Sequence, residues 1–236
     1  MDTRINEKGW LQQAWSRGLK WWPAKTAGLT LGMSLFFIAY FAVLRHPLFP
    51  VAIMPVTALD RLIPFRPAAL PLYFSLWFYV SLVPAFMIDR RELVSYTLAA
   101  VGISGVGLGI FLLWPTTVDW TDADWSRHPT FAFLQSVDAS GNACPSLHVA
   151  FAVFTALCLG RLLPQMGAGR GLAVVNWLWC LGILYSTIAI RRHVALDVFA
   201  GMALGGLAAA IHLRWLARDG RQRTPEESRP PAPAPK

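Results

Sequence analysis

The stretch that decides the fold is "GLAVVNWLWCLGILYSTIAIRRHVALDVFAGMALGGLAAAIHLRWL", residues 171–216. It contains two apolar runs, 171–190 and 194–216, which are separated only by Arg191, Arg192 and His193. Each run has the length of about 20 residues that a helix needs to cross the hydrocarbon core of a bilayer. The stretch therefore predicts two membrane-spanning helices joined by a short polar turn at one membrane surface.

The same pattern occurs four more times, at 27–44, 70–88, 94–114 and 146–163. The composition agrees with it, because 55% of the residues are hydrophobic, only 14% are charged and the mean hydropathy is +0.45. These values are too apolar for an ordinary soluble domain. We therefore predict an all-α polytopic membrane protein, a bundle of six transmembrane helices.

The segment after the first run does not fit a membrane crossing. "HPLFPVAIMPVTALDRLIPFRP", residues 46–67, contains five prolines and the charges of Asp60, Arg61 and Arg66. Proline removes a helical hydrogen bond and buried charges are costly, so we expect a proline-broken segment at the outer surface.

Three parts of the chain follow from this pattern. Residues 1–26 are predicted to be a cytoplasmic or interfacial N-terminal segment, and 27–217 the six-helix membrane domain. Residues 218–236 are rich in proline and poor in apolar residues, which predicts a disordered cytoplasmic tail.

The basic residues predict the orientation. Six crossings put both termini on one side, and 15 of the 21 Lys and Arg residues then lie on the side of the termini. Cytoplasmic loops are enriched in these residues, so we expect cytoplasmic termini in a bacterial-type inner (plasma) membrane. The basic residues form short flanks rather than a patch, which argues against nucleic acid as a partner.

Three ionisable residues lie where two of the runs begin on the outer side. His148 is at the start of the fourth run and His193 at the start of the sixth, with one crossing between them. Asp197 follows His193 by four residues, on the same side of a helix. A carboxylate that accepts a hydrogen bond from one ring nitrogen leaves the other nitrogen as an oriented nucleophile or base. His148 then suits the role of an acid or base across a bound reactant.

The sequence "CPSLH" before the fourth run adds a site for an anion. Pro145 suits the first turn of a helix, and the free N–H groups of a helix N-terminus attract a phosphate. Ser146 adds a hydroxyl group. Asp119, Asp122 and Asp124 alternate with tryptophans, which favours an interface-anchored loop over a metal site. We predict neither a metal nor a cofactor.

"CPSLHVAF" and "STIAIRRHVALDVFAG" together resemble the second and third motifs of the type-2 phosphatidic acid phosphatase superfamily. Those motifs read Pro-Ser-Gly-His and Ser-Arg, five residues, His, three residues, Asp. The resemblance implies a six-helix membrane bundle with its active site on the outer face. It implies that His193 is a nucleophile that forms a phosphohistidine, that Asp197 orients it, and that His148 is the general acid.

The chain departs from these motifs at two positions. Leu147 stands where glycine is commonest, and Thr187 where an arginine that binds phosphate is expected. The first motif, a Lys with an Arg-Pro pair, is not recognisable after Trp114. In this reduced form the motifs are similar to those of the inositol phosphorylceramide synthase branch. We expect other arginines to bind the phosphate: first Arg191 and Arg192, then Arg66, with Arg61 and Arg127 also on outer segments.

Three hypotheses remain for the function. The first is a membrane lipid phosphatase that cleaves a lipid phosphoester through a phosphohistidine. The second is a lipid phosphotransferase, in which a lipid hydroxyl replaces water as the acceptor. The third is a non-catalytic scaffold or lipid transporter, against which the presence of His148, His193 and Asp197 argues.

Overall fold

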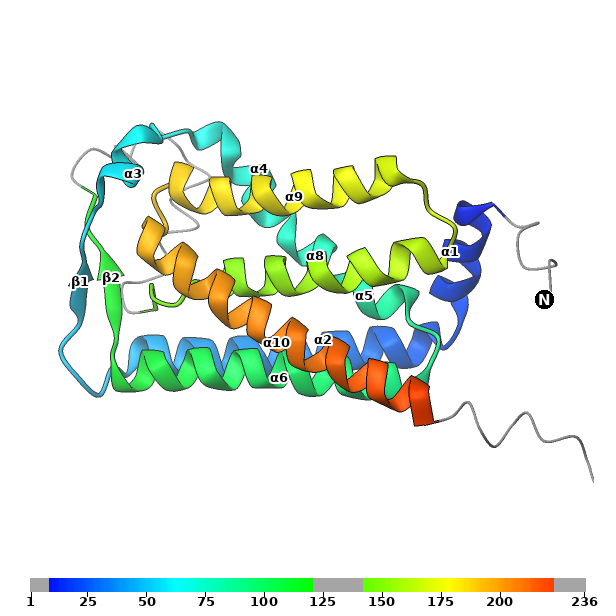
Figure 1. Cartoon of the computed structure of the whole chain (residues 1–236). Coiled ribbons are helices and arrows are strands. Elements are labelled where there is room, and N and C mark those ends of the chain that lie inside the picture. Colours follow the sequence, from blue (N-terminus) through cyan, green and yellow to red (C-terminus); the bar gives the residue numbers. More distant parts are fainter. Residues whose placement is uncertain (1–8, 121–141, 223–236) are drawn as a thin grey trace, which may run out of the picture.

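The computed structural model describes residues 9–120 and 142–222, and most of its long helices run roughly parallel, with α10 inclined to them (Figure 1). The N-terminal half contains α1 (Trp10–Leu19), α2 (Trp22–Arg45), β1 (Ala52–Met54), α3 (Ala58–Leu62), the 3-10 turn η2 (Pro67–Ala69), α4 (Leu70–Phe74) and α5 (Leu76–Phe86). The C-terminal half contains α6 (Arg90–Leu113), β2 (Thr116–Val118), α8 (Leu147–Gln165), α9 (Arg170–Ala189) and α10 (Ala195–Gln222).

Six helical stretches of the described chain are long and apolar enough to cross a membrane, which confirms the predicted fold class. Their bounds are Trp22–Arg45, Pro67–Phe86, Arg90–Leu113, Leu147–Gln165, Arg170–Ala189 and Ala195–Arg218. The first begins at Trp22, earlier than the predicted residue 27. Pro23 lies in its first turn, where proline is favoured, and the long side chain of Lys25 can reach the membrane surface.

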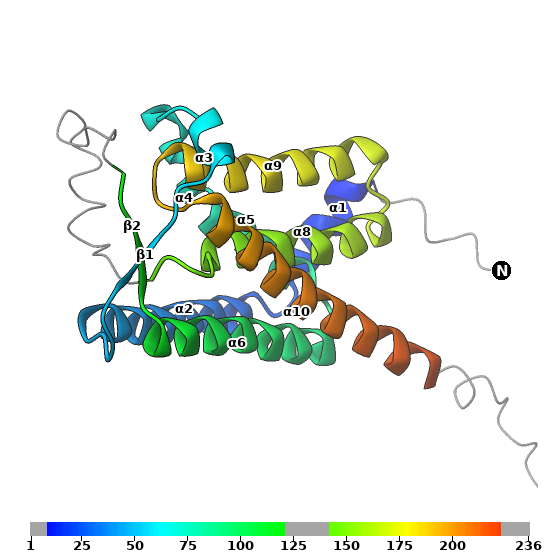
Figure 2. The same cartoon turned by 60° about the vertical axis from the view of Figure 1, so that its left-hand side comes forward.

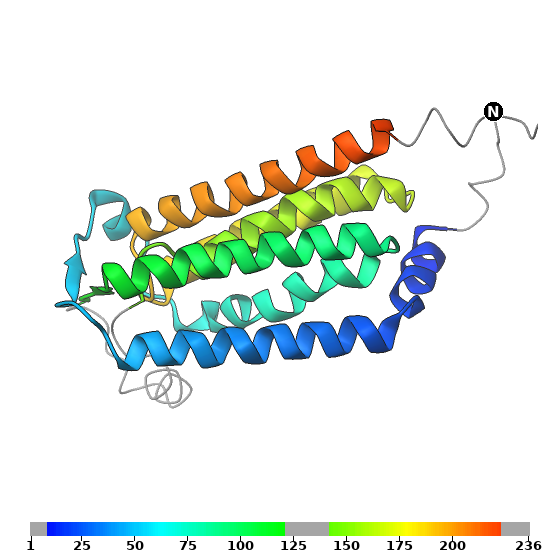
Figure 3. The same ribbon diagram turned by 90° about the horizontal axis from the view of Figure 1, so that it is seen from below.

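Helix α8 is the centre of the bundle. It contacts α5, α6, α9 and α10, and most of its residues are buried, whereas α2 is almost wholly exposed on the outside of the bundle. In Figures 2 and 3, α2 and α6 run side by side on one side of the bundle, and α10 crosses over α6 and α8. An exposed apolar helix such as α2 is stable when lipid covers it.

The contact between α10 and α8 depends on two glycines. A Cβ atom at Gly201 would overlap the carbonyl oxygen of Ser146, and one at Gly205 would overlap the carbonyl oxygen of Ala150. In lipid no hydrophobic force drives helices together, so small residues that allow close backbone contact hold such pairs. Gly201 and Gly205 therefore allow the close packing of α10 on α8.

At the end of the bundle that carries the starts of α8 and α10, the proline-broken segment folds into β1, α3 and η2 (Figure 1). β1 pairs in parallel with β2, in the register Ala52 with Thr116 and Met54 with Val118. The backbone of Thr116 also pairs with Asn142, and its hydroxyl accepts a hydrogen bond from the N–H of Cys144. This small sheet, absent from the sequence prediction, fixes the chain just before α8.

Helix α1 lies at the opposite end of the bundle (Figure 3). The guanidinium group of Arg17 donates to the carbonyl oxygens of Phe86 and Gln165, both at 3.4 Å. These two carbonyls belong to the last turns of α5 and α8, where helical carbonyls have no partner within the helix. The N-terminal segment is thus attached to the bundle end away from the two histidines.

The close contact of Gly205 with α8 can be tested by mutation. Gly205→Ala should lower the melting temperature in detergent, because α10 must move away from a rigid carbonyl group of α8, at a cost of about 1–3 kcal/mol. Gly206→Ala is the matched control, since a Cβ there meets nothing within 4 Å. Equal melting temperatures for the two variants would contradict the proposed packing role of Gly205.

Candidate active site

The candidate site begins where α9 ends. The N–H of Arg192 donates to the carbonyl of Thr187 at 3.0 Å, and the N–H of Arg191 donates to that of Ile188 at 2.9 Å. These two bonds form a Schellman motif, which closes a helix C-terminus. The N–H of His193 also donates to the carbonyl of Thr187, at 3.1 Å. The turn that carries His193 is therefore fixed to the last turn of α9 by its backbone.

Arg191 occupies the left-handed position of this motif, with φ +61°. Glycine is usual there, because a side chain costs about 1–2 kcal/mol in this conformation. The guanidinium group of Arg191 lies 3.9 Å from the ring centroid of Trp120 and donates to the carbonyl of Asp60 at 3.3 Å. The arginine side chain thus makes contacts that glycine would lose, and strained residues of this kind cluster at functional sites.

Two buried carboxylates hold the first backbone N–H groups of α10. Asp60 Oδ1 accepts from the N–H of Ala195 at 2.6 Å, and Asp197 Oδ2 accepts from that of Val194 at 3.0 Å. Thr57 donates to Asp60 from both its N–H and its hydroxyl, each at 2.7 Å. Both carboxylates are fully buried, and negative charge at a helix N-terminus is stabilised by the helix dipole. Asp60 therefore joins the proline-broken segment to α10.

His193 lies beside one of these carboxylates. Its Nδ1 atom is 3.5 Å from Asp197 Oδ2, and the residue is only 8% exposed. The four-residue spacing thus brings the two side chains together as expected, but Nδ1 has no hydrogen-bond partner in the described structure. A hydrogen bond from Nδ1–H to the carboxylate would leave the lone pair on Nε2.

His148 lies in the first turn of α8, and the N-terminus of that helix is joined to α10 by the bond from the N–H of Ser146 to the carbonyl of Asp197. Its ring stacks on Tyr73 with centroids 3.8 Å apart, and the carbonyl of Tyr73 accepts a hydrogen bond from Nε2 at 2.8 Å. Nδ1 is then the ring nitrogen that can gain or lose a proton. The two histidines therefore come from different helices to one end of the bundle.

Ser146 is the N-cap of α8. Its hydroxyl accepts from the N–H of Val149 at 3.3 Å, and its own N–H donates to the carbonyl of Asp197 at 3.0 Å. Pro145 precedes this cap in a cis peptide bond, rather than lying in the first helical turn as we expected. The cap places the N-terminus of α8 directly beside the first turn of α10.

The structure shows what surrounds Leu147 and Thr187, the two residues that depart from the family motifs. The side chain of Leu147 packs against Gly107 of α6, where a Cβ would overlap it, so this leucine fits into the bundle. Thr187 is buried and its hydroxyl donates to the carbonyl of Leu184 at 2.8 Å, within α9. Neither side chain contacts His193 through a hydrogen bond in the described part of the chain.

The arginines that we expected to bind phosphate do not all lie beside His193. Arg191 and Arg192 lie in the turn beside His193, whereas Arg66 has an exposed side chain and reaches this region by a backbone bond from its N–H to the carbonyl of Ala189, at 2.8 Å. Arg61 is exposed on α3. Arg127, Asp122 and Asp124, which precede α8 in the chain, lie outside the described residues.

Asp60, Trp120 and Tyr73 are site neighbours that the sequence reasoning missed. A signal for Asp60 was present, because Thr57 and Asp60 have the spacing of a capping box. Trp120 and Tyr73 carry no such signal, since their roles depend on contacts between distant segments. Among the described residues, no group of three His, Cys, Asp or Glu side chains is arranged to hold a metal ion.

Comparison with known proteins identifies the family of the chain. Residues 91–221, more than half of the chain, match the model of the PAP2 superfamily. The chain is also similar to lipid phosphate phosphatase gamma of Arabidopsis thaliana, with 30% identity over 157 residues, or 62% of this chain and 67% of that protein. No solved structure gives a significant match. The matched region includes six of the candidate site residues, which are Ser146, His148, Arg191, Arg192, His193 and Asp197. The chain belongs to the PAP2 superfamily.

Proposed function

We propose that this protein is an integral membrane lipid phosphate phosphatase that uses His193 as its nucleophile. The observation that carries the proposal is the position of His193 beside the buried carboxylate of Asp197, with His148 brought to the same end of the bundle by another helix. Family membership and the similarity to a lipid phosphate phosphatase support the same class of reaction.

In the proposed reaction, His193 Nε2 attacks the phosphorus atom of a lipid phosphate. The bond from phosphorus to the lipid oxygen breaks, and His148 gives its proton to that oxygen, which releases the lipid alcohol. Water then attacks the phosphohistidine, and His148 accepts the proton of that water. The bond from phosphorus to Nε2 breaks, and inorganic phosphate leaves. Asp197 stabilises the positive charge on His193 in both steps.

The negative charge of the phosphate is balanced in this proposal by the turn that carries His193 and by the start of α8. Arg191 and Arg192 lie next to His193 in sequence, and a guanidinium group can bind phosphate through two parallel hydrogen bonds. Ser146 and the N-terminus of α8 add a hydroxyl and backbone N–H groups. Arg66 is the further candidate, at the membrane surface.

Transfer of the phosphorylated group to a lipid hydroxyl is the second candidate. It is favoured by Thr187, because the usual arginine is replaced by a side chain that bonds to its own helix. The two reactions share the first step and differ only in the acceptor. Free phosphate indicates hydrolysis and a new phospholipid indicates transfer, when the purified protein is given phosphatidate, phosphatidylglycerophosphate, a polyprenyl pyrophosphate, or phosphatidylinositol with ceramide.

The nucleophile can be tested directly. His193→Ala should lower turnover by on the order of 10⁴- to 10⁶-fold, because no other group replaces a lost nucleophile. With substrate labelled in the phosphate group, wild-type protein quenched in base should carry label on His193, located by peptide mass spectrometry. His212→Ala is the control, since His212 is buried in α10 and bonds to Ser95 Oγ of α6. Activity of His193→Ala equal to that of wild type would show that the nucleophile is another residue.

Asp60 should act as a positioning residue for this turn. Asp60→Asn keeps the side-chain size but removes the charge from the N-terminus of α10, so we expect kcat to fall by roughly 10- to 100-fold with little change in KM, because 1.4–2.8 kcal/mol of lost positioning corresponds to these factors. Asp119→Asn, which removes an exposed charge at the same end of the bundle, is the matched control.

A purely structural role of Asp60 would lower the melting temperature and leave the kcat of the remaining folded enzyme unchanged. Asp60→Glu restores the charge, and partial recovery of kcat in this variant would support the positioning role. Equal kcat values for Asp60→Asn and Asp119→Asn would contradict it.

We further propose that residues 27–217 form the enzymatic domain and that its active site faces outward from a bacterial-type inner membrane, with cytoplasmic termini. The support is the distribution of basic residues, 15 of 21 on the side of the termini. His193 and Asp119 lie at the opposite end of the bundle from α1 (Figure 1).

Thiol labelling in intact cells tests this orientation. The native cysteines Cys144, Cys158 and Cys180 are buried, and burial with the nearby Asp197 carboxylate raises the pKa of the Cys144 thiol to about 11. At pH 7 that thiol is neutral and unreactive, so wild-type protein should not label. Asp119→Cys should react with an impermeant maleimide and Gly169→Cys should not. The reverse pattern would invert the topology.

A further inference from the structure

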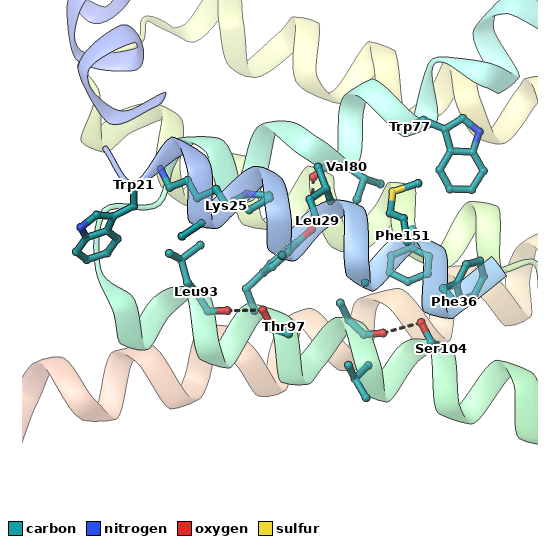
Figure 4. Close-up of a pocket in the computed structure, with 18 of the residues that line it drawn as sticks. Trp21, Lys25, Leu29, Phe36, Trp77, Val80, Leu93, Thr97, Ser104 and Phe151 are labelled. Atoms are coloured by element: carbon teal, nitrogen blue, oxygen red, sulfur yellow. Dashed lines mark hydrogen bonds between the residues drawn. The ribbon is translucent and has the colours of Figure 1, made fainter. Parts of the chain in front are cut away.

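An apolar cavity of about 640 Å³ lies within the membrane-spanning part of the protein, and none of the candidate catalytic residues lines it (Figure 4). It is bounded by α2 on one side and α6 on the other, with residues of α5 and α8 between them. Its volume falls within the range of about 300–1,000 Å³ that is typical of small-molecule pockets. The cavity is therefore large enough for an extended hydrocarbon chain.

Small side chains create this space. They recur at four-residue spacing on α2 and at similar spacing on α6, and those that line the cavity are Ala24, Gly28, Gly32, Thr97, Ala100 and Ser104. Such a pattern usually allows two helices to pack closely. Here it does not, because a Cβ at Gly28 or at Gly32 would meet nothing within 4 Å. The small residues of α2 leave a groove rather than a helix contact.

Aromatic rings stand at the end of the cavity nearer to the active site. Phe36 and Phe151 meet edge to face with centroids 6.1 Å apart (Figure 4), and the centroid of the Trp77 ring lies 5.8 Å from that of His148. Phe36, Phe151 and Trp77 all line the cavity. Bulky rings thus lie between the groove and His148.

The other end of the cavity is positively charged. Lys25 and Trp21 line it there (Figure 4), together with Arg90, the first residue of α6, at the end of the bundle that carries α1. Lys25 Nζ donates to the carbonyls of Arg17 and Ala85, at 2.9 and 2.7 Å, which uses two of its three N–H groups. The positive charges of Arg17 and Lys20 are close to it. An anion bound at this end would reduce the repulsion among these cations.

We propose that the groove binds an anionic glycerophospholipid from the membrane leaflet opposite to the His193 site. One acyl chain lies between α2 and α6, against Gly28 and Gly32. The phosphate group lies at Lys25 and Arg90, with Trp21 at the level of the headgroups, where tryptophan is favoured. The charge of the cavity end selects an anionic lipid over a zwitterionic one, and the apolar lining selects a chain over a soluble phosphate.

The test measures bound lipid and needs no turnover, so its result is separate from that of the proposed phosphatase activity. Phosphatidylglycerol is the probe, because it is a phosphodiester with no terminal phosphate group to cleave. Full-length protein is incubated in detergent with equal amounts of phosphatidylglycerol and phosphatidylcholine, and the lipids that remain bound are counted by native mass spectrometry. We expect phosphatidylglycerol to be retained in preference.

Two variants locate the site. Gly28→Leu with Gly32→Leu fills the groove and should abolish the retained lipid, whereas Gly102→Leu with Gly105→Leu, at exposed glycines of α6 outside the cavity, should not. Arg90→Gln should lower the preference for phosphatidylglycerol roughly fivefold, the factor for one charge near a headgroup, and Arg170→Gln should not. The Arg90 comparison remains informative if the filled variant does not fold.

Equal retention of the two lipids by wild-type protein would overturn the proposal, and so would unchanged retention in both the filled variant and Arg90→Gln. A third result would also overturn it. If the filled variant keeps its phosphatidylglycerol but loses activity on long-chain substrates while keeping that on short-chain ones, the groove holds the chain of the substrate.

Discussion

The structure of the candidate site depends on how the first N–H groups of α10 are satisfied. A helix that begins at a membrane boundary has backbone donors without partners in the helix, and leaving them buried and unpaired is costly. Asp197 and Asp60 accept hydrogen bonds from two of them. Asp197 also lies beside His193, so the carboxylate that caps the start of α10 is in contact with the histidine. The proline-broken segment takes part in the same capping through Asp60.

In the turn before α10, the backbone motif that ends α9 also determines where the arginine and histidine side chains lie. A Schellman motif ends α9 and directs the chain back into the bundle within three residues. Glycine would suit the left-handed position better than Arg191 does. The contacts of the Arg191 guanidinium group with Trp120 and Asp60 offset the backbone cost and bring a positive charge to the turn of His193. Local backbone strain here accompanies a charge that the proposed chemistry needs.

The sequence predicts the helices and the histidine pair for a clear reason. Apolar runs of membrane length, and a spacing of four residues between His193 and Asp197, depend on local geometry alone. The small sheet of β1 and β2, and the hydrogen bond from the N–H of Ala195 to Asp60, join segments that are far apart in the chain. A local sequence pattern therefore cannot predict them. Leu147 is an example of a residue whose packing the sequence does not predict. Its side chain packs against Gly107 of another helix, and this contact is known only from the folded structure.

The proposed reaction brings an anion to a site that contains two carboxylates, and one oxygen of each accepts a hydrogen bond from a backbone N–H group at the start of α10. Asp60 and Asp197 each face backbone N–H groups, and helix α10 directs its positive end toward both. Their negative charges lie at the positive end of the helix they cap, and Arg191 and Arg192 directly precede His193 in the chain. Phosphoryl transfer needs positioning and the stabilisation of negative charge more than it needs covalent chemistry from the protein. Asp60 of α3 and Asp197 of α10 cap α10, His193 lies beside Asp197, and Arg191 and Arg192 precede His193 in the chain. This arrangement is the basis of the proposed phosphoryl transfer.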